Sequence, residues 1–196
     1  NFSEYGDLIS SNEINPMDIN AGYAKRFDNL ANINTSKDSG KTIVSIFSSI
    51  KRTFPMKIDM MEKHPLGSQA FIPMQETTFL CFVAPSSETP EIKKIKAFIV
   101  PPKMGINYKP GIWHFPLLST EDTDFLVIDR KGSGENLVTY KFEKDEVVKK
   151  DGDPYLVYTP YKNTWKENFK DHTLKIHYTS QHLDNTVKNT RLPNVS

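Results

Sequence analysis

The sequence has a single cysteine, no large excess of charge of either sign and no long apolar run. Cys81 cannot form an internal disulfide, and its place in the apolar run TFLCFVA predicts a small buried core residue. A lone thiol favours a reducing compartment, so we expect the protein in the cytoplasm. The 25 Lys and Arg residues nearly balance the 24 Asp and Glu residues, which gives no indication of a nucleic-acid or polyanion binder. No run approaches the length of a membrane span, and none has the form of a signal peptide.

The chain does contain many short stretches rich in β-branched and aromatic residues. Several alternate apolar and polar positions with a period of two, and Pro- and Gly-containing segments separate them. The predicted strands are residues 41–49, 56–62, 77–84, 95–100, 124–130 and 136–142. Helical patterns are few, with one turn expected at 91–95 and two at 164–171. This spacing predicts an all-β fold, an antiparallel barrel or sandwich.

The composition and the patterning of the sequence change near Lys149. We therefore expect one domain over residues 1–148 and a C-terminal extension over 149–196, whose role the sequence does not indicate. The extension contains two further strand-like stretches, 155–159 and 174–178, followed by a polar tail.

Polar residues cluster just before the apolar run AFI in EKHPLGSQAFIP, residues 62–73, and beside a turn in KPGIWHFP, residues 109–116. Cupin barrels carry His-x-His-x4-Glu in one motif and Pro-x-Gly-x2-His in another. Glu62, His64 and Gln69 keep the first spacing with two residue types changed, and Pro110-Gly111-x2-His114 is close to the second. The spacing predicts that Glu62, His64, Gln69 and His114 surround a common point at the mouth of a small barrel, although a single histidine beside a turn, taken alone, is more often structural.

The segment MEKHPLGSQAFIPM, residues 61–74, closely resembles the signature of the ureidoglycolate lyases. Further similar segments follow in the family's order, covering about residues 2–134: FSEYGDLIS, INAGYAKRFDNLA, KAFIV, GINYKPGIWHFPLL and DFLVIDR. The resemblance implies a cupin-like β-barrel and a homodimer. It also implies a lyase that cleaves the small molecule ureidoglycolate into glyoxylate and urea during allantoin breakdown, with no nucleic-acid or membrane partner.

On this resemblance, His64 and His114 are the candidate acid and base, without a decision on which does which. Gln69 is expected to match the ureido group, and Arg26 to hold the substrate carboxylate through two parallel hydrogen bonds. The remaining expected substrate-binding residues are Glu62, Tyr108 and Lys109.

Four nearby residues receive expectations of their own. Gly67 is expected to permit the tight turn between His64 and Gln69. Lys63 is expected to face solvent because it alternates away from its neighbours. Asp129 and Arg130 are interpreted as a buried structural ion pair, with a place in the site as the alternative.

No cofactor is expected, since only two imidazoles remain and an amide replaces a carboxylate. One alternative is a metal-dependent cupin in which Glu62, His64, Gln69 and His114 hold Mn, Fe or Zn weakly while acting on another small carboxylic acid. A second alternative is a non-catalytic barrel that binds a small acid. It is suggested by Asp28, Lys109 and Phe115, which stand where many family members carry histidine.

Overall fold

The computed structural model describes residues 1–12, 14–54, 56–142 and 177–178, which form two main β-sheets. The five-stranded sheet has the order β1 (Gly6–Ile9), β9 (Gly105–Tyr108), β6 (Gln69–Pro73), β12 (Thr123–Lys131) and β4 (Lys41–Ser49). We call it sheet I. Sheet II has the order β13 (Val138–Lys141), β5 (Met60–Lys63), β10 (Trp113–His114), β7 (Phe79–Ala84), β8 (Lys96–Val100) and β14 (His177–Tyr178), with β11 (Leu118–Ser119) paired to β7.

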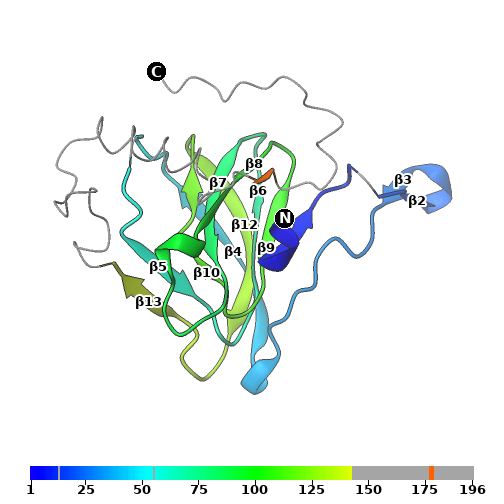
Figure 1. Ribbon diagram of the computed structural model, residues 1–196. Helices are drawn as coiled ribbons and strands as arrows, with labels where there is room; N and C mark the ends of the chain where they lie inside the picture. The colour runs from blue at the N-terminus through cyan, green and yellow to red at the C-terminus, as the bar shows by residue number, and fades with distance from the viewer. Residues whose placement is uncertain (13, 55, 143–176, 179–196) are drawn as a thin grey trace.

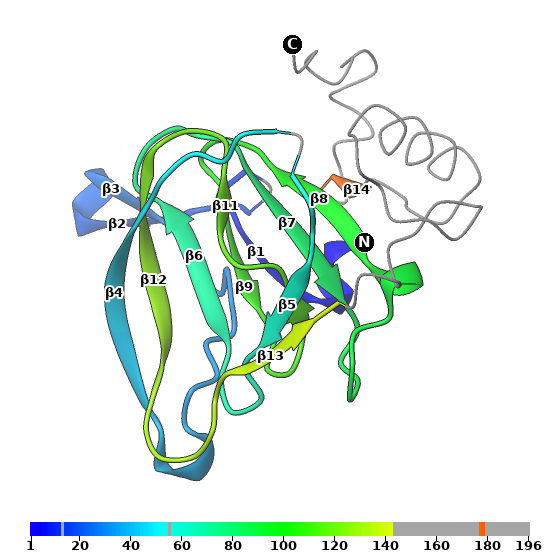
Figure 2. The ribbon, with the colours of Figure 1, turned by 90° about the vertical axis from the view of Figure 1, so that its left-hand side faces the viewer.

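All strand pairs are antiparallel except β14 with β8, which is parallel. Figure 2 shows sheet I running from β4 across to β9, with strands of sheet II in front of it. Helical structure in the described residues is limited to four 3₁₀ turns: η1 (Phe2–Glu4), η2 (Asn20–Gly22), η3 (Lys37–Ser39) and η4 (Ile92–Lys94). The expected all-β, cupin-like fold is confirmed. Within these residues, no helix has the length and apolar character needed to cross a membrane.

The core lies between the two sheets because apolar residues alternate along their strands. On β12, Phe125 and Val127 are fully buried, whereas Leu126 and Ile128, which point to the other face, are only partly covered. The inner faces contribute aromatic rings in edge-to-face contact, such as Phe79 and Phe125, whose centroids lie 5.2 Å apart. The same cluster contains Cys81. The period of two therefore sets which side chains face the centre of the molecule.

The six predicted strands are all present, with shifts at their ends. Residues 41–49 form β4 over the predicted span, and the turn expected at 91–95 is η4. The strand expected at 56–62 is shorter, beginning only at Met60. The expected helix at 164–171 and the strand at 155–159 lie outside the described residues, and of the stretch 174–178 only β14 is described.

A two-stranded arm projects from the sheets near the N-terminal end of the chain, as Figure 1 shows at its right-hand side. It consists of β2 (Met17–Ile19) and β3 (Ala24–Arg26), joined by η2. Tyr23 follows η2 and is 94% exposed. Within the part of the chain that the structure describes, the arm has no strand pairing with either main sheet.

Burial raises the pKa of the Cys81 thiol to about 12. Because the thiolate is the reactive form, the native protein should react with a disulfide reagent at pH 8 on the order of 10³-fold more slowly than the unfolded chain. Labelling rates with and without denaturant measure this. Equal rates in the two states would contradict the placement of Cys81 in the core.

Candidate functional site

Two rows of polar side chains face each other from the two sheets. In sheet II, Glu62 of β5 is the register partner of His114 of β10. In sheet I, Gln69 of β6 is the register partner of Tyr108 of β9. The rings of Tyr108 and His114 stack at 4.3 Å between centroids and 15° between planes, so the rows are in direct contact. His64 follows β5 and lies 5.3 Å from His114, centroid to centroid. The structure thus brings Glu62, His64 and His114 together, whereas Gln69 is linked to them through the ring of Tyr108.

His64 is held by a single hydrogen bond from its ring. Its Nδ1 lies 2.6 Å from the carbonyl oxygen of Asn136, which can only accept, so Nδ1 carries the proton. The Nε2 atom of the neutral ring is therefore an acceptor, and it is buried without a hydrogen-bond partner among the described residues. Burial, and next the charge of His114, lower the pKa of His64. The neutral ring is therefore favoured near pH 7.

His114 is held in the same way but faces a carboxylate. Its Nδ1–H donates to the carbonyl oxygen of Ile112 at 3.0 Å, and the residue is 1% exposed. Its Nε2 has no hydrogen bond to any described residue and lies 3.6 Å from Oε1 of Glu62, an ion-pair distance that is too long for a hydrogen bond. Burial of Glu62 acts to raise the pKa of this carboxyl, but its contact with His114 and the charge of His64 outweigh burial, and the pKa of Glu62 is lowered. Glu62 is thus a charged neighbour suited to an Nε2–H of His114.

The turns that carry the two histidines are fastened to each other. The backbone N–H of Gly111 donates to the carbonyl oxygen of His64 at 2.9 Å. Gly111 has a φ of 79°, a left-handed conformation that favours glycine. Glycine is required at position 67 for a different reason from the tight turn that was expected, because the φ of Gly67 is not in the left-handed region. A Cβ at Gly67 would lie 2.6 Å from Cβ of Arg130, so a side chain at this position would collide with β12.

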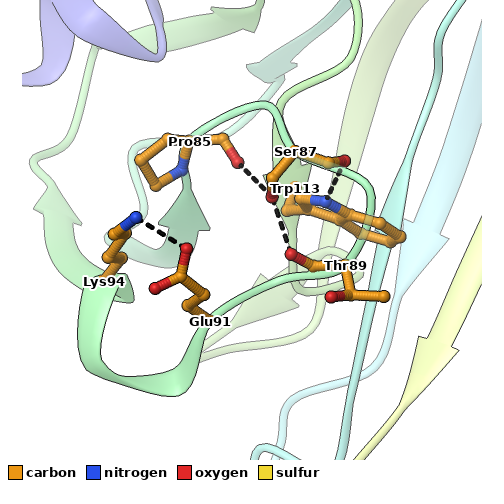
Figure 3. A network of polar contacts seen from close by, with 6 residues as sticks. All are labelled: Pro85, Ser87, Thr89, Glu91, Lys94 and Trp113. Carbon is orange, nitrogen blue, oxygen red and sulfur yellow. Dashed lines mark hydrogen bonds and ion pairs between the residues drawn. The ribbon is translucent and has the colours of Figure 1, made fainter.

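Contacts on the outer face of sheet II hold β5 and β10, the strands beside His64 and His114, in place. Lys63 points away from the site, as expected, but it is not a free solvent-facing residue. Its Nζ donates to the carbonyl oxygen of Ser87 at 2.6 Å and lies 4.3 Å from the ring centroid of Trp113. Figure 3 shows the Trp113 indole N–H donating to the same carbonyl and the Ser87 hydroxyl donating to the carbonyls of Pro85 and Thr89. These contacts tie β5, β10 and the loop after β7 together.

The Asp129 side chain lies on the inner face of sheet I, and the prediction that it forms a structural ion pair with Arg130 is wrong. Neighbours on a strand point to opposite faces, and the described residues show no ion pair between these two. Arg130 donates instead to the carbonyl oxygens of Lys37, Asp38 and Ser133. The Asp129 carboxyl accepts a hydrogen bond from the Gln69 side chain and senses the charge of His64. Burial, the largest influence on this group, raises the pKa of Asp129.

The other expected substrate-binding residues have different surroundings. Tyr108 is buried, and its hydroxyl hydrogen-bonds the thiol of Cys81, so its contact with the site is the stacked ring. Arg26 lies on the projecting arm, with a side chain that is 61% exposed and an Nε that donates to Asp28 at 2.6 Å. Lys109 is exposed and donates to the carbonyl oxygen of Ser3. The structure does not bring Arg26 or Lys109 to the histidine cluster.

Three ligand atoms in the cluster could hold a divalent cation. One atom each of Glu62, His64 and His114 lies within 4.8 Å of the others. Both ring Nδ1–H groups donate to backbone carbonyls, which is the usual support for a histidine that ligates through Nε2. The donor set therefore fits a borderline metal such as zinc.

Sequence reasoning missed Asn136, which fixes His64 through its carbonyl and also accepts from the Leu66 N–H through Oδ1 at 2.8 Å. No motif marks it, because it lies 72 residues away from His64 and acts partly through its backbone.

Comparison with known proteins gives a consistent result. The family model described as ureidoglycolate lyase matches residues 1–149. The chain is 42% identical over 146 residues to the ureidoglycolate lyase of Pseudomonas paraeruginosa, covering 74% of this chain and 86% of that protein. It is 40% identical over 154 residues to the ureidoglycolate lyase of Pseudomonas syringae pv. tomato, covering 78% of this chain and 91% of that protein.

Removing the Asn136 side chain should loosen the turn that follows His64. Asn136→Ala leaves the Leu66 N–H without its acceptor, so we expect a loss of about 1 kcal/mol in the free energy of unfolding. Asn136→Asp keeps an acceptor oxygen and should lose less. Denaturant unfolding of both variants measures the difference, and equal stability of Asn136→Ala and the wild type would show that this hydrogen bond contributes nothing.

Proposed function

Because the chain belongs to the ureidoglycolate lyase family, we propose that it cleaves ureidoglycolate into glyoxylate and urea, in the breakdown of allantoin. The observation that carries the proposal is the pair of adjacent imidazoles, each with a buried Nε2 that has no hydrogen bond among the described residues. Proton transfer is what this reaction requires, and histidine is the side chain best suited to it near neutral pH.

The substrate has one carbon that bears a carboxylate, a hydroxyl and a urea nitrogen. Cleavage breaks the bond between that carbon and the nitrogen and forms the carbonyl of glyoxylate. The hydroxyl proton must leave, and the departing nitrogen must gain a proton, because a urea anion is a poor leaving group. One base and one acid therefore suffice, and each typically contributes ~10² to 10⁴ in rate.

The contacts of the two rings favour one assignment of these roles. His64 is the base, because its Nδ1–H donates to the carbonyl oxygen of Asn136 and its lowered pKa favours the neutral ring. Nε2 is then available to accept the hydroxyl proton. His114 is the acid, because its Nε2 lies 3.6 Å from Oε1 of Glu62, a carboxylate oxygen that faces an Nε2–H at ion-pair distance. Glu62 thus acts on the substrate through His114.

Two further residues complete the proposal. Gln69 is 7% exposed, and its Oε1, which has no partner among the described residues, is available for the ureido group; the ring of Tyr108 stacks on the ring of His114. Arg26 and Lys109 receive no role in it, since the side chains of both are engaged elsewhere in the chain.

A second candidate adds a divalent cation to the same cluster. The ligand atoms of Glu62, His64 and His114 and their carbonyl-bound Nδ1–H groups favour it. When bound, a cation would polarise an oxygen of the substrate. Elemental analysis of the untagged protein, followed by activity measurements after chelation and after return of Zn²⁺ or Mn²⁺, separates the candidates: the metal-free mechanism requires full activity after chelation.

We infer a homodimer formed through the outer face of sheet I. Val44 and Ile46 of the edge strand β4 are 64% and 60% exposed, and they are register partners of the outward-facing Ile128 and Leu126. Ile72 of β6 continues the row beside Leu126. A contiguous apolar face at an unpaired sheet edge is the usual mark of a subunit interface. The single buried thiol also leads us to infer a cytoplasmic location.

Removal of either Nε2 should abolish most of the lyase activity without unfolding the protein. In His64→Asn and His114→Asn the amide N–H can replace Nδ1–H toward Asn136 or Ile112, so the turns are kept while the reactive nitrogen is lost. We expect kcat/KM to fall at least ~10²-fold in each variant, assayed as urea and glyoxylate released from racemic ureidoglycolate. Thermal unfolding of both variants serves as the control.

The pH profile tests the assignment of the base. Since the pKa of His64 lies below 6.5, the wild-type kcat/KM should rise with pH to a plateau with its midpoint below pH 6.5. The residual activity of His64→Asn should lack this limb. Near-wild-type turnover in either variant would remove that histidine from the mechanism, and no turnover in the wild type would leave only small-acid binding.

The dimer predicts a specific sensitivity to charge on the outer face of sheet I. Ile46→Lys should weaken self-association at least ~10-fold, because a charge is left in an apolar interface. Leu137→Lys, at a 52% exposed position beside β13 of the other sheet, is the matched control and should not change it. Light scattering at micromolar concentration measures the mass, and a monomeric wild type would rule the dimer out.

A further inference from the structure

The inner face of sheet I ends in a row of three polar positions. The pairing of β6 with β12 runs from Pro73–Phe125 to Ala70–Ile128, so the next position places Asp129 opposite Gln69. Gln69 is in turn the register partner of Tyr108 on β9. Asp129 shares its face with the core residue Val127 two positions earlier on the strand. Asp129 and Gln69 thus lie side by side on the face that looks toward the histidines.

Both of these side chains carry a buried oxygen without a partner. The Gln69 amide donates to the Asp129 carboxyl, which leaves Gln69 Oε1 and Asp129 Oδ1 unpartnered in the described part of the chain. Buried polar atoms are nearly always hydrogen-bonded in folded proteins, so two neighbouring exceptions call for a ligand. Both atoms are acceptors, and their ligand must therefore bring donors.

The two ends of ureidoglycolate differ in this respect. The carboxylate is only an acceptor, whereas the ureido end carries an NH₂ group and an N–H. Resting on the proposed function, we propose that Asp129 and Gln69 form the subsite that binds the two N–H bonds of the terminal ureido NH₂ group, which makes Asp129 a specificity-determining residue. The subsite orients the urea nitrogen toward the histidines. The proposal also explains why the Asp129 carboxyl lies beside Gln69: it accepts from the amide NH₂ and so directs Oε1 of Gln69 toward the ligand.

Unreactive analogues allow this subsite to be tested without turnover. N-Carbamoylglycine carries the ureido and carboxylate groups but no hydroxyl, and N-acetylglycine differs from it only by a methyl in place of the NH₂. Titration calorimetry on the full chain should show tighter binding of N-carbamoylglycine by at least ~10-fold, because N-acetylglycine leaves the acceptors unpaired.

Asp129→Asn is the decisive variant. Gln69 draws the new amide oxygen toward itself, so the NH₂ of the asparagine replaces Oδ1 and sets a donor against a donor. We expect the preference for N-carbamoylglycine to fall to less than ~2-fold, with N-acetylglycine binding unchanged. Asp124→Asn, the same change on the same strand at a carboxylate that accepts from Ser48, should keep the full preference. Gln69→Met removes Oε1 and should also abolish it, which gives a second test if Asp129→Asn fails to fold.

The outcomes separate this proposal from the proposed function. A full preference in Asp129→Asn and Gln69→Met, in an enzyme that releases urea, would overturn the subsite alone. A wild type that prefers the ureido analogue but releases no urea would overturn the lyase and keep the subsite. Equal binding of both analogues by the wild type would overturn the subsite whatever the activity.

Discussion

The register between β5 and β10 is the constraint on which the site depends. It pairs Glu62 with His114 and so turns both side chains inward, while Met61 and Trp113 turn outward and are fully buried there. A slip of one residue in this register would turn each of these four side chains to the opposite face of sheet II. The apolar side chains would then face the polar residues of sheet I, and the Glu62 carboxylate would be buried on the outer face. The Gly111 N–H on the His64 carbonyl and the positive φ of Gly111 hold the strands against such a slip. The chemistry of the cluster is thus a consequence of strand pairing.

Much of the fold could be predicted because strand periodicity is a local property. The run at 41–49 alternates with a period of two and forms β4 over that span. The strands that escaped prediction are short or surrounded by turns, such as β1 (Gly6–Ile9) and β10 (Trp113–His114), where two to four residues show no period. Their formation depends on partners such as β9 and β7, which are distant in sequence. Pairing over such distances leaves no trace in a short window of residues.

The residues of the candidate site also divide into those that local sequence could predict and those that it could not. Glu62 and His64 lie close together on one strand and the turn after it, and their spacing was enough to predict that they meet; Gln69, on the next strand, reaches the cluster through the ring of Tyr108. Arg26 was chosen for its chemistry alone, and chemistry does not locate a residue: its chain segment forms the projecting arm. Asp129 was interpreted with Arg130 because the two are adjacent in sequence, yet a strand separates adjacent residues onto opposite faces. Local spacing is therefore a better guide to a site than residue type.

The closeness of the two imidazoles has a consequence for the proton balance of the proposed reaction. Cleavage takes one proton from a hydroxyl and gives one to a nitrogen, so the protein neither gains nor loses charge over a turnover. It ends with the proton on the other ring, 5.3 Å away by centroid distance and in the same buried cluster. Only an internal transfer between neighbouring groups is then needed to restore the starting state. A site of this kind can work while closed to bulk water, since its two histidines share a single stored proton.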